Sequence, residues 1–208
     1  NTVGALRLVF SIDDGVLTPQ ARAIAIDRGA THPQPEIRDL FERFVPEEQR
    51  TKRLGTVVDV PELLATPGDP RRGRELFLHT EGVQCKSCHK LGEVGGDVGP
   101  DLRKIANKST RAEMLESILE PSKKIDPKYV SYLVETVQGR IFTGLLVSKS
   151  DAQVVLRDAQ NKLITIAADE IELLTPQQKS LMPELLLRDL TEQHVADLLA
   201  FLASLKEG

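Results

Sequence analysis

Cysteine, methionine and histidine are rare in this chain of 208 residues, which has only two cysteines, two methionines and four histidines. The scarcity limits which metal sites the chain can build. A structural zinc site needs four ligands, normally from two Cys or His pairs at ribbon or finger spacing. Three histidines lie outside one short cluster: His32, His79 and His194. They form no second ligand pair of that kind. A zinc site is therefore disfavoured.

The sequence also lacks long hydrophobic runs and a large charge excess. No apolar run reaches transmembrane length, and the N-terminus has none of the basic, apolar and cleavage-site regions of a signal peptide. The formal net charge of −4 gives no indication of nucleic-acid binding. Because the chain begins at Asn1 without a methionine, we expect a processed or excised piece of a longer protein.

Both cysteines lie in one pentapeptide, Cys85-Lys86-Ser87-Cys88-His89. C-x-x-C-H is the attachment motif of a c-type haem, in which the two thiols form thioethers and the histidine binds the iron. A thioredoxin-like redox pair is the other interpretation of C-x-x-C, but that pair opens a helix in a βαβ unit and needs no histidine. Here a loop containing Gly82 comes first. The motif predicts one covalent haem c and, since such haem is attached outside the bacterial cytoplasm, a periplasmic or otherwise extracytoplasmic location.

Proline and glycine positions divide the chain. We expect a helical segment over residues 1–55, with helix starts at Thr18-Pro19 and Pro35, a stop at Gly29 and a third helix from Pro46 to Gly55. This segment resembles the last turns of a helical repeat array. Residues 56–68 are expected to be a connector, and residues 69–208 a haem domain.

Two amphipathic helices are expected to frame that domain. One begins at Asp69-Pro70 and carries Gly73 and Phe77 on one face, and the other runs from Thr191 to Leu205. A glycine on the first helix would let the second cross close to its backbone.

Residues 129–174 instead have β-branched and aromatic residues with regular turns, which predict an antiparallel meander of four or five strands. The expected strands cover residues 129–137, 140–147, 153–157, 163–167 and 171–173. The expected fold class is thus mainly α with a β insertion.

The order G-x-x-x-F, C-x-x-C-H, G-P-x-L, Met-Pro and D-L-x-x-F-L resembles class I cytochrome c. More narrowly, the motifs at residues 72–77, 98–102, 118–122 and 180–184 are similar to the c-type haem domain of planctomycete and verrucomicrobial proteins. The resemblance implies that His89 is the proximal iron ligand, that the Pro100 carbonyl accepts a hydrogen bond from its second ring nitrogen, and that Met182 is the distal ligand.

Met114 is the only other methionine, and it lies on the apolar stripe of a helix that includes Leu115, Ile118 and Leu119. A methionine in that position more often fills a core. Met182 precedes Pro183 in a nonhelical segment, which suits a loop across a haem face. A distal site that is open or differently ligated is the alternative.

The expected function is one-electron transfer, without enzymatic activity of this domain, between a separate or fused dehydrogenase and a respiratory acceptor. One alternative is a haem-based sensor or haem enzyme with an open or labile distal site. Another is a structural haem with the β segment as an interaction or oligomerisation module. Six lysines could form a basic rim near the haem, although interleaved acids favour a mixed surface: Lys86, Lys90, Lys104, Lys123, Lys124 and Lys128. Tyr129, Tyr132, His79 and His194 receive no role.

Overall fold

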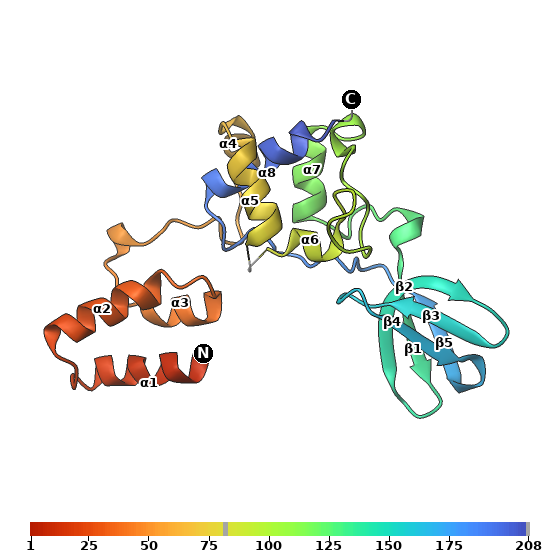
Figure 1. Cartoon of the computed structure of the whole chain (residues 1–208), viewed down its shortest axis with the longest axis horizontal. Helices are drawn as coiled ribbons and strands as arrows, with labels where there is room; N and C mark the ends of the chain where they lie inside the picture. The colour runs from red at the N-terminus through yellow and green to blue at the C-terminus, as the bar shows by residue number, and fades with distance from the viewer. Residues whose placement is uncertain (81–82, 207–208) are drawn as a thin grey trace. The chain divides into compact units, whose positions relative to one another are not determined.

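The structure, a computed structural model, describes residues 1–80 and 83–206. The chain forms two compact units, Asn1–Leu54 and Gly55–Gly208. Within the described residues the first unit contains α1 (Thr2–Asp13), α2 (Pro19–Ala30), α3 (Pro35–Glu42) and the 3₁₀ turn η1 (Glu47–Gln49). The second unit begins with helices: α4 (Val60–Ala65), α5 (Pro70–His79), α6 (Cys85–Cys88), η2 (Ile105–Asn107), α7 (Arg111–Leu119) and η3 (Pro127–Tyr129). It continues with β1 (Ser131–Thr136), β2 (Ile141–Lys149), β3 (Gln153–Arg157), β4 (Leu163–Ala167), η4 (Ala168–Glu170), β5 (Ile171–Pro176) and α8 (Glu192–Ser204), as Figure 1 shows.

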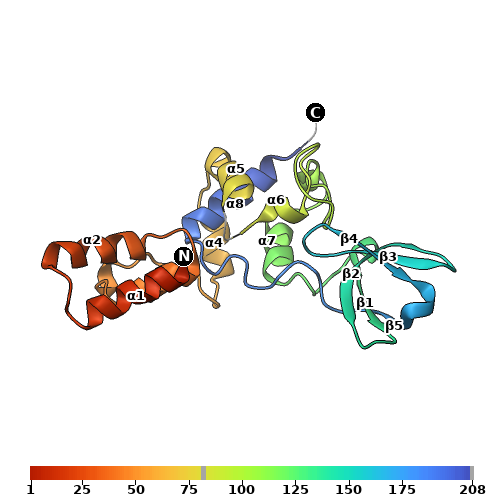
Figure 2. The ribbon, with the colours of Figure 1, turned by 60° about the horizontal axis from the view of Figure 1, so that its bottom comes forward.

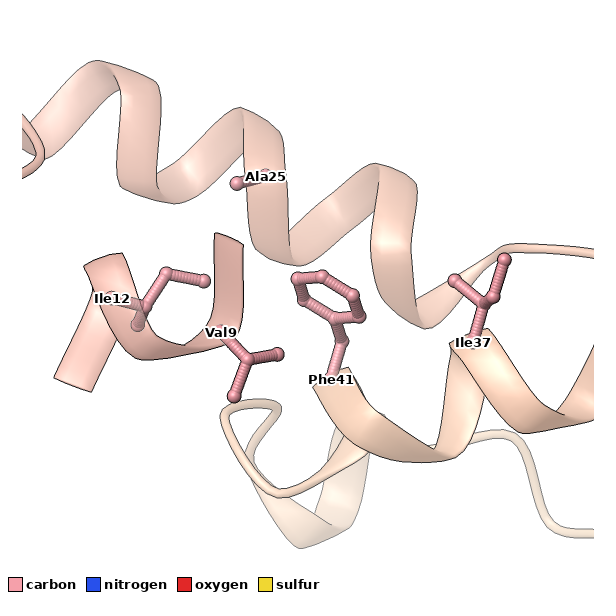
Figure 3. Packing of buried hydrophobic residues seen from close by; sticks show 5 residues of the cluster. All are labelled: Val9, Ile12, Ala25, Ile37 and Phe41. Carbon is pink, nitrogen blue, oxygen red and sulfur yellow. The ribbon is translucent and has the colours of Figure 1, made fainter. Parts of the chain in front are cut away.

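The first unit packs three helices around Phe41, which is 1% exposed. Figure 3 shows the Phe41 ring between α1, α2 and α3, with Val9, Ile12, Ala25 and Ile37 around it. Gly29 lies inside α2 rather than after it, and a Cβ there would stand 2.2 Å from the Phe41 ring. The glycine therefore makes room for the ring, and the helix ends one residue later.

The starts of α2 and α3 confirm the sequence prediction, whereas the helix expected from Pro46 to Gly55 was wrong. Only the short turn η1 forms there, and the backbone is extended at Arg50. Residues 47–53 contain no apolar side chain, so a helix over them would have no face to bury.

The second unit is organised by the crossing of α5 and α8, which lie side by side in both views (Figure 1 and Figure 2). Asp69 caps α5 by accepting a hydrogen bond from the Arg71 backbone N–H at 2.7 Å, as the sequence predicts. A Cβ on Gly73 would lie 2.0 Å from the Asp197 carbonyl oxygen, and the Phe77 and Phe201 rings pack with centroids 5.7 Å apart. The close crossing expected at Gly73 is confirmed.

The crossing also buries one carboxylate. Asp197 is 1% exposed and accepts hydrogen bonds from Arg72 Nε at 2.6 Å, the Asp69 backbone N–H at 2.7 Å and Gln193 Nε2 at 2.9 Å. Burial alone raises the pKa of Asp197, but these donors outweigh it and lower the pKa to about 2. Asp197 thereby joins the start of α5 to α8.

The segment expected to be a connector contains α4, whose Leu63 is 1% exposed. Arg111 Nη2 donates a hydrogen bond to the Thr66 carbonyl at 2.8 Å, which ties the end of α4 to the start of α7. Residues 60–66 thus pack within the second unit. The expected boundary between a connector and a separate domain after residue 68 stays a prediction.

The β segment is a five-stranded antiparallel sheet in the order β4-β3-β2-β1-β5. The first four strands form the expected meander, and β5 returns to pair with β1. The chain is therefore a mixed α/β protein. Tyr129, expected to open the first strand, lies instead in η3, because the Asp126 carboxylate accepts from the Lys128 N–H and Pro127 favours a turn.

Among the described residues no helix combines the length and the hydrophobicity that crossing a membrane requires.

Removal of the Asp197 charge tests the crossing. The folded pKa of about 2 lies below the unfolded value of 3.8, so the carboxylate stabilises the fold above pH 4 and loses this contribution as the pH falls toward 2. We expect Asp197→Asn to lower the free energy of unfolding by about 2 kcal/mol at pH 7 and to flatten its dependence on pH between 2 and 4. Urea titrations over this pH range measure both effects. Asp151→Asn, at an exposed turn, is the control, and equal losses in the two variants would contradict the assignment.

Candidate functional site

The C-x-x-C-H segment forms one helical turn, α6, with His89 as its C-terminal cap. The His89 backbone N–H donates to the Cys85 carbonyl at 2.9 Å. Residues three and four apart lie on the same side of a helix, so Cys85, Cys88 and His89 share one side of this turn. The loop that contains Gly82 lies outside the described residues.

A glycine-rich loop packs along the end of α6. The backbone N–H of Gly96 donates to the Lys86 carbonyl at 2.8 Å, and those of Val98 and Gly99 donate to the Cys88 carbonyl at 3.1 and 2.8 Å. A Cβ on Gly96 would stand only 1.9 Å from the Ser87 carbonyl oxygen. The loop therefore satisfies carbonyl groups that a helix end leaves free, at a distance that only glycine permits.

This loop also orients the His89 ring. The His89 Nδ1 lies 3.0 Å from the Pro100 carbonyl oxygen, which can only accept, so Nδ1 carries the proton. A Cβ on Gly99 would stand 2.5 Å from the ring carbon Cε1. Burial lowers the pKa of His89, and the Pro100 hydrogen bond opposes that shift. The result is a neutral imidazole, and its Nε2 lone pair is available to a metal. The contact between His89 and Pro100 that the resemblance implied is present.

The motif borders a cavity of about 250 Å³ between α5, α7, α8 and the segment after β5. Cys85, His89 and Met182 all line it, and so does Met114. Most of the remaining lining is apolar, including Phe77, Val83, Leu102, Ile105, Ile118, Ile125, Leu186, Leu187, Leu198 and Leu202. An apolar chamber with an imidazole, a thioether sulfur and a thiol in its wall suits the donor set and the dry environment of a covalent haem. The residues present therefore fit the group that the motif implies.

The two methionines differ in how the chain holds them. Met182 lies in the nonhelical segment between β5 and α8, as expected, and its N–H donates to Ser180 Oγ at 3.1 Å. The Ser180 N–H in turn donates to Ser122 Oγ at 3.2 Å, which connects the segment to the end of α7. Met114 is 4% exposed within α7 itself.

Both thiols are free, and their surroundings bear on the redox alternative. Burial raises the pKa of Cys85 to about 12 and raises the pKa of Cys88 as well. Thioredoxin-like pairs work through a thiol whose pKa is lowered. The site therefore does not favour that interpretation.

In the described part of the chain no group of three or more His, Cys, Asp and Glu side chains is placed to hold a metal ion. An iron held by a porphyrin needs no such group, because the porphyrin supplies four of its ligands.

Several other candidates lie away from the cavity wall. Tyr132 packs against the core of the sheet, His79 lies 3.6 Å from Glu75, and the His194 ring caps the N-terminus of α8. Among the rim lysines, Lys90 lies 3.1 Å from Asp97 and Lys123 lies 2.6 Å from Glu116, which makes a mixed surface there.

Sequence reasoning missed three contributors to the site. Tyr129 lines the cavity, and burial raises its pKa, with nearby carboxylates acting in the same direction. Gly95 and Gly96 seat the loop on α6, and this pair of adjacent glycines in the segment between His89 and Pro100 was the signal that could have revealed them.

A comparison with protein-family models finds no match for this chain, and a comparison with curated proteins finds none either.

A methyl group at Gly99 tests the seating of the loop on the His89 ring. We expect Gly99→Ala to lower the free energy of unfolding by about 1 to 3 kcal/mol, because either the ring or the loop must move. Val94→Ala removes an exposed side chain from the same loop and should change the stability by less than about 0.5 kcal/mol. Chemical denaturation measures both, and a Gly99→Ala protein as stable as the wild type would contradict the packing.

Proposed function

We propose that residues 69–208 are a c-type haem domain similar to class I cytochrome c, of the planctomycete and verrucomicrobial type, and that it transfers single electrons. The observation that carries the proposal is the placement of the C-x-x-C-H turn: His89, bonded to Pro100, lines the same apolar cavity as Met182. The proposal rests on this geometry and on the motif, because the comparisons contribute no relative.

In this proposal Cys85 and Cys88 would form the two thioethers, and His89 Nε2 and Met182 Sδ would bind the iron. The bound haem supplies an iron that changes between two oxidation states by one electron. The chain's own part is to keep the imidazole neutral and oriented through Pro100 and to exclude water with apolar side chains. A thioether ligand and a mainly apolar cavity wall both favour the reduced state and so raise the potential.

Met182 is the better candidate for the distal ligand for a structural reason. Its segment is fixed by Ser180 and Ser122 but is not part of a helix, so the thioether can be presented by a loop that adapts to the ligated group. Met114 is one of the core residues of α7, next to the fully buried Leu115. Moving it would disturb the packing of that helix.

The proposal also covers the location of the protein and its redox partners. Thioether formation on C-x-x-C-H takes place outside the bacterial cytoplasm, which implies an extracytoplasmic location. The domain itself would not be an enzyme and would carry electrons from a fused or separate dehydrogenase to a respiratory acceptor. The β insertion offers a surface for a redox partner or for a second copy.

Absorption spectra of the haem-loaded protein, oxidised and reduced, with and without carbon monoxide, test the ligand set. We expect sharp low-spin bands, a weak far-red methionine-to-iron band in the oxidised state and no response to carbon monoxide. Ready carbon monoxide binding by the wild type would overturn the carrier in favour of a sensor or a haem enzyme.

Two methionine variants assign the distal ligand. Met182→Ala should lose the far-red band, bind carbon monoxide and have a lower midpoint potential, because the thioether no longer stabilises the reduced iron. Met114→Leu, which conserves volume, should keep the wild-type spectrum. The opposite result for the pair would make Met114 the ligand.

A further inference from the structure

The loop that holds His89 has a second edge that faces the β sheet. Its inner edge carries the N–H groups of Gly96, Val98 and Gly99, which bond to the α6 carbonyls. The Asp97 N–H, which lies between those of Gly96 and Val98 in the chain, donates instead to Asn161 Oδ1 at 3.3 Å. Asn161 lies in the turn between β3 and β4, 64 residues further along the chain. The loop is thus bonded on both edges.

Charge reinforces this contact. Arg157, the last residue of β3, has its Nη2 atom 3.8 Å from the Asp97 carboxylate, and its Nη1 atom donates to Asn161 Oδ1 at 2.9 Å. The Arg157 side chain is 21% exposed and the Asp97 side chain 52%, so solvent screens the pair and the charge contributes modestly beside the hydrogen bonds. Lys90, directly after the C-x-x-C-H motif, lies 3.1 Å from the other carboxylate oxygen of Asp97. Asp97 therefore connects the sheet to the residue that follows His89.

The turn that presents Asn161 is itself well fixed. The Asp158 carboxylate accepts hydrogen bonds from the N–H groups of Gln160 and Lys162 at 2.9 and 2.8 Å. Asn161 has a φ of 63°, a left-handed conformation that asparagine tolerates better than most residues. Paired strands on both sides anchor the turn. Because the turn is held in place by its own hydrogen bonds, its contact with Asp97 can restrain the loop 95–100.

We propose that Arg157 and Asn161 are positioning residues for the His89 ligand, acting through Asp97 and the loop 95–100. The inference rests on the proposed haem function and deepens it, since it gives the β insertion a role at the iron. The carbonyl of Pro100 lies three residues after Asp97 and receives the His89 Nδ1–H bond. Strengthening that bond makes the imidazole a more electron-rich ligand, which favours the oxidised iron. Removing the restraint weakens the bond and raises the midpoint potential.

The test uses Asn161→Gly in the haem-loaded chain. Glycine keeps the left-handed backbone of the turn and removes Asn161 Oδ1, which accepts from both the Asp97 N–H and Arg157 Nη1. We expect the equilibrium constant for reduction by a one-electron mediator to rise about threefold, less than the tenfold or greater effects of losing a direct partner of a metal ligand. We also expect faster hydrogen exchange at the Asp97 and Gly99 amides, with the low-spin His/Met spectrum retained.

Arg157→Gln is the second variant, because it leaves the turn and its backbone bonds in place should Asn161→Gly fold poorly. It should shift the potential in the same direction. Lys162→Gln is the matched control, since it removes a positive charge from the same turn. The hydrogen bonds described for Lys162 are made by its backbone N–H and carbonyl, which the substitution keeps. Its potential should equal that of the wild type within error.

The outcomes separate the two proposals. A loaded wild type with His/Met bands, together with unchanged potentials in Asn161→Gly and Arg157→Gln, overturns the positioning role and leaves the electron carrier standing. A shift of equal size in Lys162→Gln means a general charge effect and also overturns it. A wild type that takes up no covalent haem overturns the proposed function and with it this inference.

Discussion

The orientation of the His89 imidazole is the constraint on which the rest of the site depends. Its Nδ1–H is committed to the Pro100 carbonyl at 3.0 Å, and Gly99 lets the backbone pass against the ring face. These two contacts leave Nε2 as the ring atom that can bind a metal. They exist only because the loop 95–100 lies against α6, which in turn requires glycine at positions 95 and 96. The chemistry of one nitrogen therefore depends on a loop of six residues.

The cavity that His89 lines is formed by elements far apart in the chain. The α5–α8 crossing brings Phe77 together with Leu198 and Leu202, and the buried Asp197 of α8 accepts hydrogen bonds from the start of α5. α7 adds a third wall, and Ser122, in the turn that follows α7, accepts a hydrogen bond from the segment that carries Met182. The N-terminal unit has its own core around Phe41.

Elements with strong local patterns were predictable. Caps and prolines marked the starts of α2, α3, α5 and α8, and alternating β-branched residues marked all five strands within a few positions. α1 lies within the segment expected to be helical, but its bounds were not predicted, because its cap is Asn1 and its apolar residues include the exposed Val3 and Phe10. The interactions of Asp197 and the contact between Asp97 and Asn161 depend on packing between distant segments, which no local pattern encodes. The C-x-x-C-H motif itself was visible in the sequence, while the cavity that it borders was not.

The most direct test of the central claim is the intact mass of the chain produced with the cytochrome c maturation system in an oxidising compartment. The account predicts a mass increase of one haem that survives denaturation and is lost when Cys85 and Cys88 are both replaced by alanine. A chain of unmodified mass under these conditions, with its two cysteines present as thiols or as a disulfide, would contradict it.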